Sequence, residues 1–419
     1  MSDSPDLSEP DTSLRALLRE RDFVLFWLSR FVAVLGVQIQ GVALGWHIYA
    51  VARETMDVKR AALIVSMIGL VSFLPVLLLA LPAGETADRH DRRRILLRCY
   101  LAEIVVAAGL TAVTFMGWAS IPVLLGAAAL FGTARSYFSP ASTALGPMLV
   151  PRPLLPRAIA WQSLAWQTAS IAGPAVGGIL VALSPTLSYG VAAALYVIAA
   201  VCVLLIRGNA QPVVQPGSRW DLMKEGLAYV WNNKIVFGAI SLDLFAVILG
   251  GATLLLPVFA KDVLHVGAQG FGILRAGPAI GAAVVAFWLA SNPIRKNAGV
   301  IMFSAVALFG VGTLIFGLSK IMWISMGGLI LLGGADMISV YVRQTLVQLA
   351  TPDHMRGRVA TVSSLFIGAS NELGEFESGI VARFLGPVGA AVFGGVGALI
   401  VTGVWAKLFP DLRKADRLT

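Results

Sequence analysis

The stretch GAAALFGTAR at residues 126–135 recurs 201 residues later as GGLILLGGAD at residues 327–336. Both stretches lie in long apolar runs, and the repeat places Arg135 and Asp336 at equivalent positions. An ionised side chain within an apolar membrane segment is costly, so it usually faces a protected or watery interior. The repeat therefore predicts a pathway or gate to which one half contributes a cation and the other an anion.

The repeat extends well beyond these ten residues. The same offset carries a further set of positions onto the second half, Pro151, Arg157, Leu164, Gly173, Gly178 and Ile179 onto Pro352, Arg358, Leu365, Gly374, Gly379 and Ile380. With a different offset, FVAVLG (31–36) resembles LFAVILG (244–250). A shared offset indicates parallel repeats, related by an axis along the membrane normal.

Composition identifies the class of protein. Of the 419 residues, 57% are hydrophobic and only 13% are charged, whereas a soluble domain is about a quarter charged. A transmembrane helix needs about 20 mainly apolar residues. We therefore predict an all-α polytopic membrane protein of two six-helix parallel repeats, with twelve transmembrane helices at residues 22–50, 61–83, 95–117, 121–147, 158–183, 187–206, 235–260, 269–291, 298–318, 322–350, 358–384 and 387–409.

The longest polar interval lies at the middle of the chain and divides it into two bundles. Its first part contains Pro and Gly and indicates a linker, and residues 220–231 can form a short amphipathic helix along the inner membrane surface. The predicted organisation is a tail, a six-helix bundle, a linker with its helix, a second six-helix bundle and a second tail, at residues 1–21, 22–206, 207–234, 235–409 and 410–419.

The net charge of +9 would suit a nucleic-acid partner, but its distribution argues against one. If both termini are cytoplasmic, most of the 32 lysines and arginines fall in the inner loops, tails and span ends. The outer loops and span ends hold only Arg53, Lys59, Arg60, Lys261, Lys320 and Arg383. This positive-inside bias supports a multi-pass topology with both termini in the cytoplasm and the lipid bilayer as partner.

The sequence offers no sign of an enzyme. The two cysteines, Cys99 and Cys202, form neither a disulfide framework nor a metal-binding spacing. It contains no P-loop, HExxH, CxxC or GxSxG pattern. We therefore expect no catalytic residues, no metal site and no cofactor.

The loop after the second predicted span is GETADRHDRRR, residues 84–94. It resembles the G-x-x-x-D-R-x-G-R-R/K loop of the major facilitator superfamily, through Gly84, Asp88, Arg89, Arg92 and Arg93. Asp91 stands where the family usually has Gly, and Thr86 where it often has Leu.

The resemblance implies that Asp88 latches against the eleventh helix, near Arg358, in the outward-facing state. The alternative is a basic loop that serves topology only.

The fifth predicted span carries a second motif, the glycine-rich sequence Gly173, Pro174, Gly177 and Gly178. Ala165 and Ala169 precede Gly173 at intervals of four, which gives the helix a smooth face for close packing. The motif resembles the GPxxGG antiporter motif of drug exporters. An ordinary tight contact between helices is the alternative.

Three stretches of the second half resemble the enterobactin-exporter-like branch of the superfamily, which lies near macrolide efflux proteins: LDLFAVILGGATLLLPVFA (242–260), FGILRAGPAIGAA (271–283) and TPDHMRGRVATVSSLFIGASNELGEFESG (351–379). The resemblance implies a monomeric secondary active transporter of the bacterial inner membrane. It would export a siderophore-like, drug-like or other amphipathic small molecule by alternating access, driven by proton antiport. The alternatives are an importer or facilitator with the same fold and, more remotely, a non-transporting receptor or scaffold.

In that fold, helices 1, 4, 7 and 10 line the central cavity, and each carries a charge here: Arg30, Arg135, Asp243 and Asp336. At about 1.5 Å per residue, Arg30 and Asp243 share a level in the inner half of the membrane. Arg135 and Asp336 share a level near its midplane. We expect the two pairs to meet between the halves in one state and to separate in another. The alternative is that each charge is neutralised within its own half.

The eleventh predicted span holds three carboxylates, of which Glu372 and Glu375 share a face with each other and with neighbouring Asn371. Three carboxylates cannot all be ionised cheaply in one apolar helix, so one could take up a proton. Arg343 could form an inner gate or an anion contact, or its head group could reach the inner surface. The remaining predicted cavity residues are Gln38, Gln40, Trp166 and Gln167.

Overall fold

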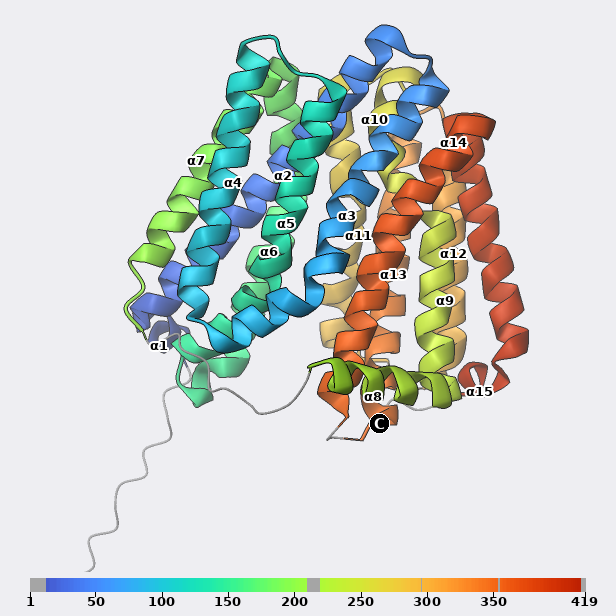
Figure 1. Ribbon diagram of the computed structural model, residues 1–419. Helices are drawn as coiled ribbons and strands as arrows, with labels where there is room; N and C mark the ends of the chain where they lie inside the picture. The colour runs from blue at the N-terminus through green and yellow to red at the C-terminus, as the bar shows by residue number, and fades with distance from the viewer. Residues whose placement is uncertain (1–12, 209–218, 295, 353–354, 416–419) are drawn as a thin grey trace, which may run out of the picture.

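A computed structural model of the chain describes residues 13–208, 219–294, 296–352 and 355–415. The predicted tails fall outside the described residues at 1–12 and 416–419, and so does the part of the predicted linker at 209–218. All the regular structure in the described part is helical. The helices form two groups that stand side by side (Figure 1).

The first group precedes the linker. Its helices are α1 (Leu14–Arg19), α2 (Arg21–Thr55), α3 (Val58–Arg89), α4 (Arg92–Phe115), α5 (Ile121–Leu145), η1 (Gly146–Leu149), η2 (Arg152–Leu154), α6 (Leu155–Leu183) and α7 (Pro185–Leu204). The second group comprises α8 (Arg219–Asn232), α9 (Lys234–Gly250), η3 (Ala252–Leu255), α10 (Leu256–Val258), η4 (Phe259–Val263), α11 (Gly267–Ser291), α12 (Ala298–Leu318), α13 (Met322–Ala350), α14 (Arg356–Leu408) and α15 (Pro410–Arg413).

Within the described residues, 11 helical segments are long and apolar enough to cross a membrane. The last of them, α14, contains both of the final two predicted spans. The chain turns inside it at Gly386, whose φ of 79° lies in the left-handed region that favours glycine. Large apolar side chains such as Val105, Phe115, Phe287 and Trp323 are exposed on the outer faces of the helices, as lipid contact requires. The chain is a multi-pass membrane protein.

The predicted span over 235–260 is confirmed, since it lies within the membrane-length segment Lys234–Val263. It is not one continuous α-helix. Regular α-helix ends at Gly250, and the chain continues through η3, α10 and η4, of which η4 is a π-helix. The break lies where Gly251 meets α14, because a Cβ there would stand 2.3 Å from the backbone carbon of Gly374. The regular helix therefore ends where the two backbones come into close contact.

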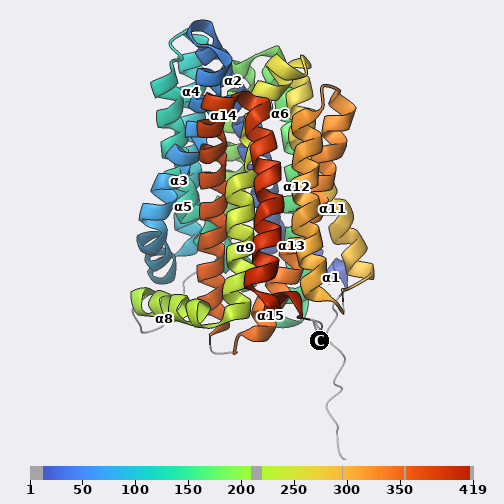
Figure 2. The same cartoon turned by 90° about the vertical axis from the view of Figure 1, so that its right-hand side faces the viewer.

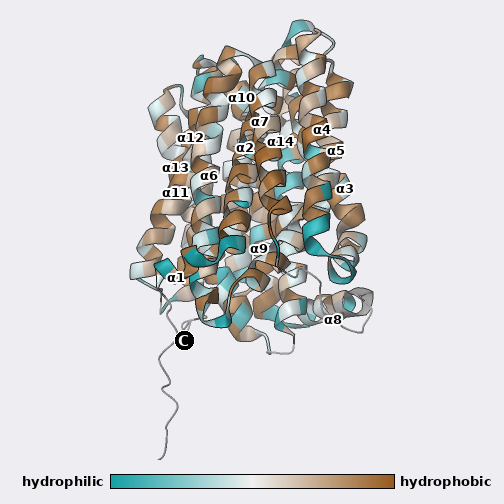
Figure 3. Cartoon of the chain, turned by 90° about the vertical axis from the view of Figure 1, so that its left-hand side faces the viewer, coloured by the Kyte–Doolittle hydropathy of each residue, from teal (hydrophilic) through white to brown (hydrophobic). Residues whose placement is uncertain are grey.

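The two ends of the molecule differ. α1, α8 and α15 lie at the same end of the bundle, called here the terminal end because the first and last described helices lie there. α8 lies across the other helices at this end (Figures 1 and 2). The opposite end, called the far end, holds the turn between α2 and α3 and the turn at Gly386. Hydrophilic residues gather at the terminal end, whereas the middle of the bundle is mostly apolar (Figure 3).

The buried apolar side chains show that the two groups share a core at one end only. One cluster joins far-end residues of both groups, including Ile48, Tyr49 and Leu124 of the first and Phe259 and Phe271 of the second. Towards the terminal end, the first group has a cluster of its own and the second group has two. The groups are therefore packed together at the far end and have separate cores at the terminal end.

Between the groups, α3 packs along α14 and α6 packs along α11. The second contact brings two backbones together, because a Cβ on Gly178 would lie 2.6 Å from the Cα of Gly272. Gly177 likewise faces α2 of its own group, where a Cβ would lie 3.1 Å from the Cα of Ile39. The glycine-rich motif thus packs α6 against both groups at once.

This contact predicts the effect of one substitution. Gly178→Val should force α6 and α11 apart and lower the free energy of unfolding by about 1–3 kcal/mol, the usual cost of overpacking a tight contact. Gly126→Ala is the matched control, because a Cβ at Gly126 meets nothing within 4 Å. Denaturation of the detergent-solubilised protein measures both. Equal stability of the two variants would contradict the close contact.

Candidate functional site

Arg135 of α5 and Glu372 of α14 form an ion pair between the two groups, midway along their helices. The Arg135 Nη1 lies 3.6 Å from the Glu372 Oε1. The Arg135 side chain is 59% exposed, although it stands in the middle of an apolar helix and points to the other group. Its guanidinium is therefore accessible rather than enclosed in a packed core.

Two further charged residues lie near this pair and form a cluster with it. Glu375 lies one turn beyond Glu372 and packs on α3, where a Cβ at Gly69 would stand 3.0 Å from the Glu375 Oε2. Arg275 of α11 lies within electrostatic range of both carboxylates. The cluster thus combines two carboxylates of α14 with one arginine from each group. Sequence reasoning left Arg275 out, because its position near the end of its helix is typical of a residue that reaches the membrane surface.

Asp336 does not meet Arg135, although the repeat places them at the same level. Asp336 is half-buried on α13, and no other described residue forms a hydrogen bond or ion pair with it. The expected contact of Arg135 with Asp336 is therefore replaced in this conformation by its contact with Glu372.

Asp243 of α9 pairs with Arg343 of α13, within the second group. Both are almost fully buried, with 7% and 2% of their surfaces exposed. The expected pairing of Asp243 with Arg30 is thus absent here, and the alternative of neutralisation within one half holds for Asp243. Arg343 is buried beside Asp243, which supplies the partner that a buried charge needs. Its head group therefore does not extend to the inner surface.

Arg30 also finds a partner in its own group, because its Nη1 donates to the Gln162 Oε1 over 3.1 Å. Its Nε is buried without a partner. Gln167 reaches across to α11, where its Nε2 donates to the Ala279 carbonyl over 3.0 Å. Among the predicted polar residues of the cavity, Gln167 is thus one that joins the two groups.

The other predicted cavity residues are placed differently from one another. Gln40 is buried, and its Oε1 has no hydrogen-bond partner. Gln38 packs beneath Gly173, where a Cβ would lie 2.5 Å from the Gln38 Cβ. Trp166 and Asn371 are exposed. They are available to a solute or to lipid, whereas Gln38 serves the contact between α2 and α6.

The loop after α3 holds the first group together. Asp91 caps α4, since its Oδ1 accepts from the Arg93 backbone N–H at 2.9 Å. This explains an aspartate where the resembling family has glycine. Arg92 donates to the Ala144 carbonyl and Arg93 to the Leu204 carbonyl, at distances of 3.1 and 2.8 Å. Both carbonyls lie at helix C-termini, where a positive charge is favourable.

The other described residues of this loop motif form no hydrogen bond or ion pair with Arg358 of α14. Arg89 pairs with Glu85 at 2.9 Å, and Gly84 is buried. Arg358 at the start of α14 pairs with Glu225 of α8 rather than with Asp88. The expected contact between Asp88 and Arg358 is thus absent from this conformation, in which the groups have separate cores at the terminal end.

No group of three His, Cys, Asp or Glu side chains in the described part of the chain is placed to hold a metal ion. The chemistry at the middle of the helices is that of ion pairs and hydrogen bonds.

The buried pair of α9 and α13 yields a stability prediction. Arg343→Met leaves Asp243 buried without its cation and should lower the free energy of unfolding by about 3–5 kcal/mol. The double variant Asp243→Leu with Arg343→Met removes both charges and should lose much less. Denaturation of purified protein compares the two. A double variant as unstable as the single one would mean that packing, not charge, dominates at this site.

Comparisons with known proteins agree on the family. The multidrug efflux pump Tap of Mycobacterium tuberculosis (strain ATCC 25618 / H37Rv) is 26% identical over 414 residues, which cover 93% of this chain and 94% of the pump. The enterobactin exporter EntS of Citrobacter koseri is 26% identical over 376 residues, or 88% and 85% of the two chains.

Solved structures share the fold. The POT family transporter PepTSo superimposes with a TM-score of 0.75 at 11% identity, over 94% of this chain and 99% of its own. A mutant of the nucleoside transporter NupG gives 0.71 at 14% identity, over 93% and 100%. Residues 12–418 match the family described as transmembrane secretion effector. The chain therefore belongs to the transmembrane secretion effector family of major facilitator transporters.

Proposed function

We propose that this transporter is a proton-driven exporter that moves an amphipathic small molecule by alternating access. The observation that carries the proposal is the ion pair of Arg135 with Glu372, which joins the two groups midway along the helices. Relative rotation of the groups changes the distance between its members, because they stand on different groups. A proton on Glu372 or an anionic solute at Arg135 would weaken the pair and bias that rotation.

The conformation supports the same mechanism. With both termini in the cytoplasm, as the positive charges favour, the terminal end faces inward. Separate cores at that end and a shared core at the far end then correspond to an inward-open state. A solute from the cytoplasm would reach Arg135 from that side, and half-exposed Trp166 adds an aromatic surface on α6.

The relatives suggest the chemistry of the solute. One relative carries the name enterobactin exporter and another multidrug efflux pump. The residues that the sequence predicts for the cavity include an arginine, amides and an indole. Such groups suit a large amphipathic molecule, and the arginine favours one with anionic groups. We therefore assign the substrate class as siderophore-like or drug-like amphipathic compounds.

Transport in everted membrane vesicles tests direction and coupling together. With an acidic lumen, the native protein should accumulate enterobactin or one of a panel of amphipathic dyes in that lumen. Glu372→Gln should abolish accumulation but retain counterflow, because coupling of about 1–3 kcal/mol between proton and solute is lost while the solute path remains. Glu377→Gln is the matched control, since it lies on another side of the same helix.

Three outcomes would count against the proposal. Full gradient-driven accumulation by Glu372→Gln would remove this carboxylate from coupling. Accumulation only in right-side-out vesicles with an acidic exterior would indicate an importer.

Metabolite profiles of cells that lack or overproduce the protein extend the search to solutes outside the panel. The exported compound should fall outside the cell in the first and rise in the second, and the reverse pattern would contradict export.

A further inference from the structure

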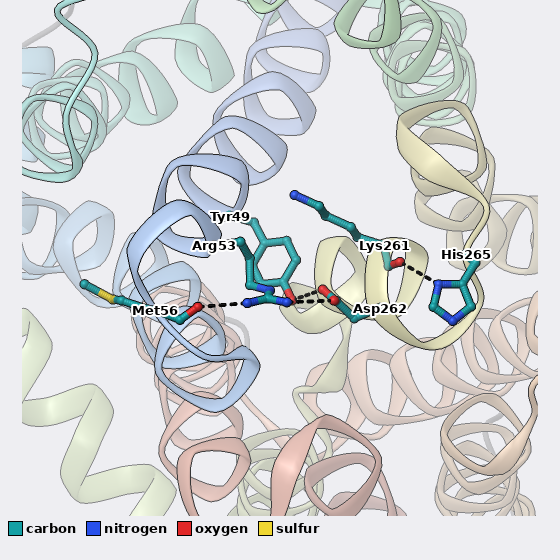
Figure 4. Close-up of polar contacts among 6 residues, drawn as sticks. All are labelled: Tyr49, Arg53, Met56, Lys261, Asp262 and His265. Carbon is teal, nitrogen blue, oxygen red and sulfur yellow. Dashed lines mark hydrogen bonds and ion pairs between the residues drawn. The ribbon is translucent and has the colours of Figure 1, made fainter.

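A single carboxylate of the second group holds two donors of the first group at the far end. Asp262, in η4, accepts a hydrogen bond from the Tyr49 hydroxyl and one from the Arg53 Nη2, the latter at 3.2 Å (Figure 4). Tyr49 and Arg53 are four residues apart on α2 and so share a face. The Asp262 carboxylate therefore binds two donors on a single face of α2, near the end of that helix.

Neighbouring contacts fix the direction of each partner. The Lys261 ammonium lies 5.7 Å from the centre of the Tyr49 ring, so the second group holds this tyrosine by its ring as well as its hydroxyl. Arg53 also donates to the Met56 carbonyl over 2.8 Å, which ties the guanidinium to the end of its own helix. These contacts leave Asp262 facing a pre-arranged pair of donors.

The backbone around Asp262 departs from regular α-helix. The Leu264 N–H bonds to the Phe259 carbonyl, five residues earlier, over 2.7 Å. The wider π turn departs from α-helical spacing, and such turns are often found at functional sites. His265 follows with a positive φ of 55°, and its Nδ1 lies 3.1 Å from the Lys261 carbonyl.

The contact sits directly on the apolar core that the groups share. Tyr49 has no exposed surface, and Ile48, Ala52, Val258 and Phe259 of the same cluster are equally enclosed. The Asp262 and Arg53 side chains are only 21% and 27% exposed. Separation of the groups at this end must therefore expose Tyr49 and leave Asp262 without both donors.

In the described part of the chain, two other polar contacts join the groups at the far end, and both lie at the surface. The Lys59 Nζ donates to the Phe384 carbonyl over 3.0 Å, and the Arg383 Nη1 lies 3.9 Å from the Asp57 Oδ1. Contacts between exposed charges contribute little. They serve as natural comparisons for the enclosed contact.

We propose that Asp262, through Tyr49 and Arg53, is the lock that keeps the far end closed, and that opening of this end requires release of both donors. The inference rests on the alternating access of the proposed function, but on neither the proton, the solute nor the direction of transport. Hydrophobic burial gives the closed state most of its stability, whereas the lock makes the closure specific to one arrangement of α2 and η4.

Spin-label distances in the full-length protein in lipid nanodiscs test the lock without substrate or gradient. Labels at Arg60→Cys and Lys320→Cys report the far end, and labels at Arg98→Cys and Asn292→Cys report the terminal end. The buried native Cys99 and Cys202 are first replaced by alanine. Asp262→Asn should raise the ratio of far-end-open to far-end-closed molecules about tenfold, as expected for loss of one charged hydrogen bond, and the terminal-end distance should shorten.

Matched variants separate the lock from a general loss of surface contacts. Lys59→Gln and Arg383→Gln should change the ratio less than about twofold. Tyr49→Phe and Arg53→Gln each remove one donor and should shift the ratio in the same direction as Asp262→Asn. If Asp262→Asn does not fold, these two donor variants test the lock in its place.

A native distance distribution in Asp262→Asn, or in both donor variants if that protein is unfolded, would overturn the proposal. An equal shift in the surface variants would do the same. Because no solute is present, either result leaves the transport assays of the proposed function unaffected.

Discussion

The structure depends on an apolar core that the two helix groups share at one end only. Tyr49 and Phe259 are buried together in that core although they come from different groups, whereas Phe26 and Met302 lie in separate cores towards the other end. Hydrophobic burial is roughly proportional to area and has no direction. A core of this kind can hold two groups together and still release them, provided that another contact is gained elsewhere. Polar contacts then determine which arrangements are allowed.

The charges within the helices divide into two kinds by their exposure. Asp243 and Arg343 are enclosed in one group, and rotation of the groups leaves them together. The Arg135 side chain is 59% exposed, and it pairs with Glu372 of the other group, whose side chain is 20% exposed. Loss of a partner would cost the pair of Asp243 with Arg343 more than the pair of Arg135 with Glu372, because both charges of the first pair are desolvated, whereas the Arg135 guanidinium stays hydrated. A contact that opens and closes during transport is therefore expected to resemble the second kind, and this difference supports Arg135 with Glu372 as the coupling pair.

Much of the fold could be predicted from the sequence, because hydropathy fixes which residues enter a membrane and the major facilitator motifs fix the family. The partners of the charges could not. Depth along a helix follows from residue number, which placed Arg30 level with Asp243, but the direction of a side chain around its helix depends on how the helices pack. Arg343 lies in the same group as Asp243 and pairs with it there. The break after Gly250 was missed for a similar reason, since hydropathy records that residues 235–260 are apolar but not that the backbone of α14 approaches Gly251.

The contacts that run along the two groups show how rotation could occur without unpacking. At Gly178 and Gly272, backbone meets backbone, and at Gly379 a Cβ would lie 1.7 Å from the Ser66 Oγ. Such surfaces carry few side chains that interlock, and small residues allow helices to approach closely and over a smooth face. Large side chains that interdigitate would have to change rotamers together, at a cost set by dense packing. The contacts of α6 with α11 and of α3 with α14 are therefore smooth surfaces that allow the groups to rotate. Arg135 and Glu372 lie midway between these contacts. A larger side chain in one of these smooth contacts should impede rotation in either direction, whereas loss of a polar contact at one end should favour opening at that end alone.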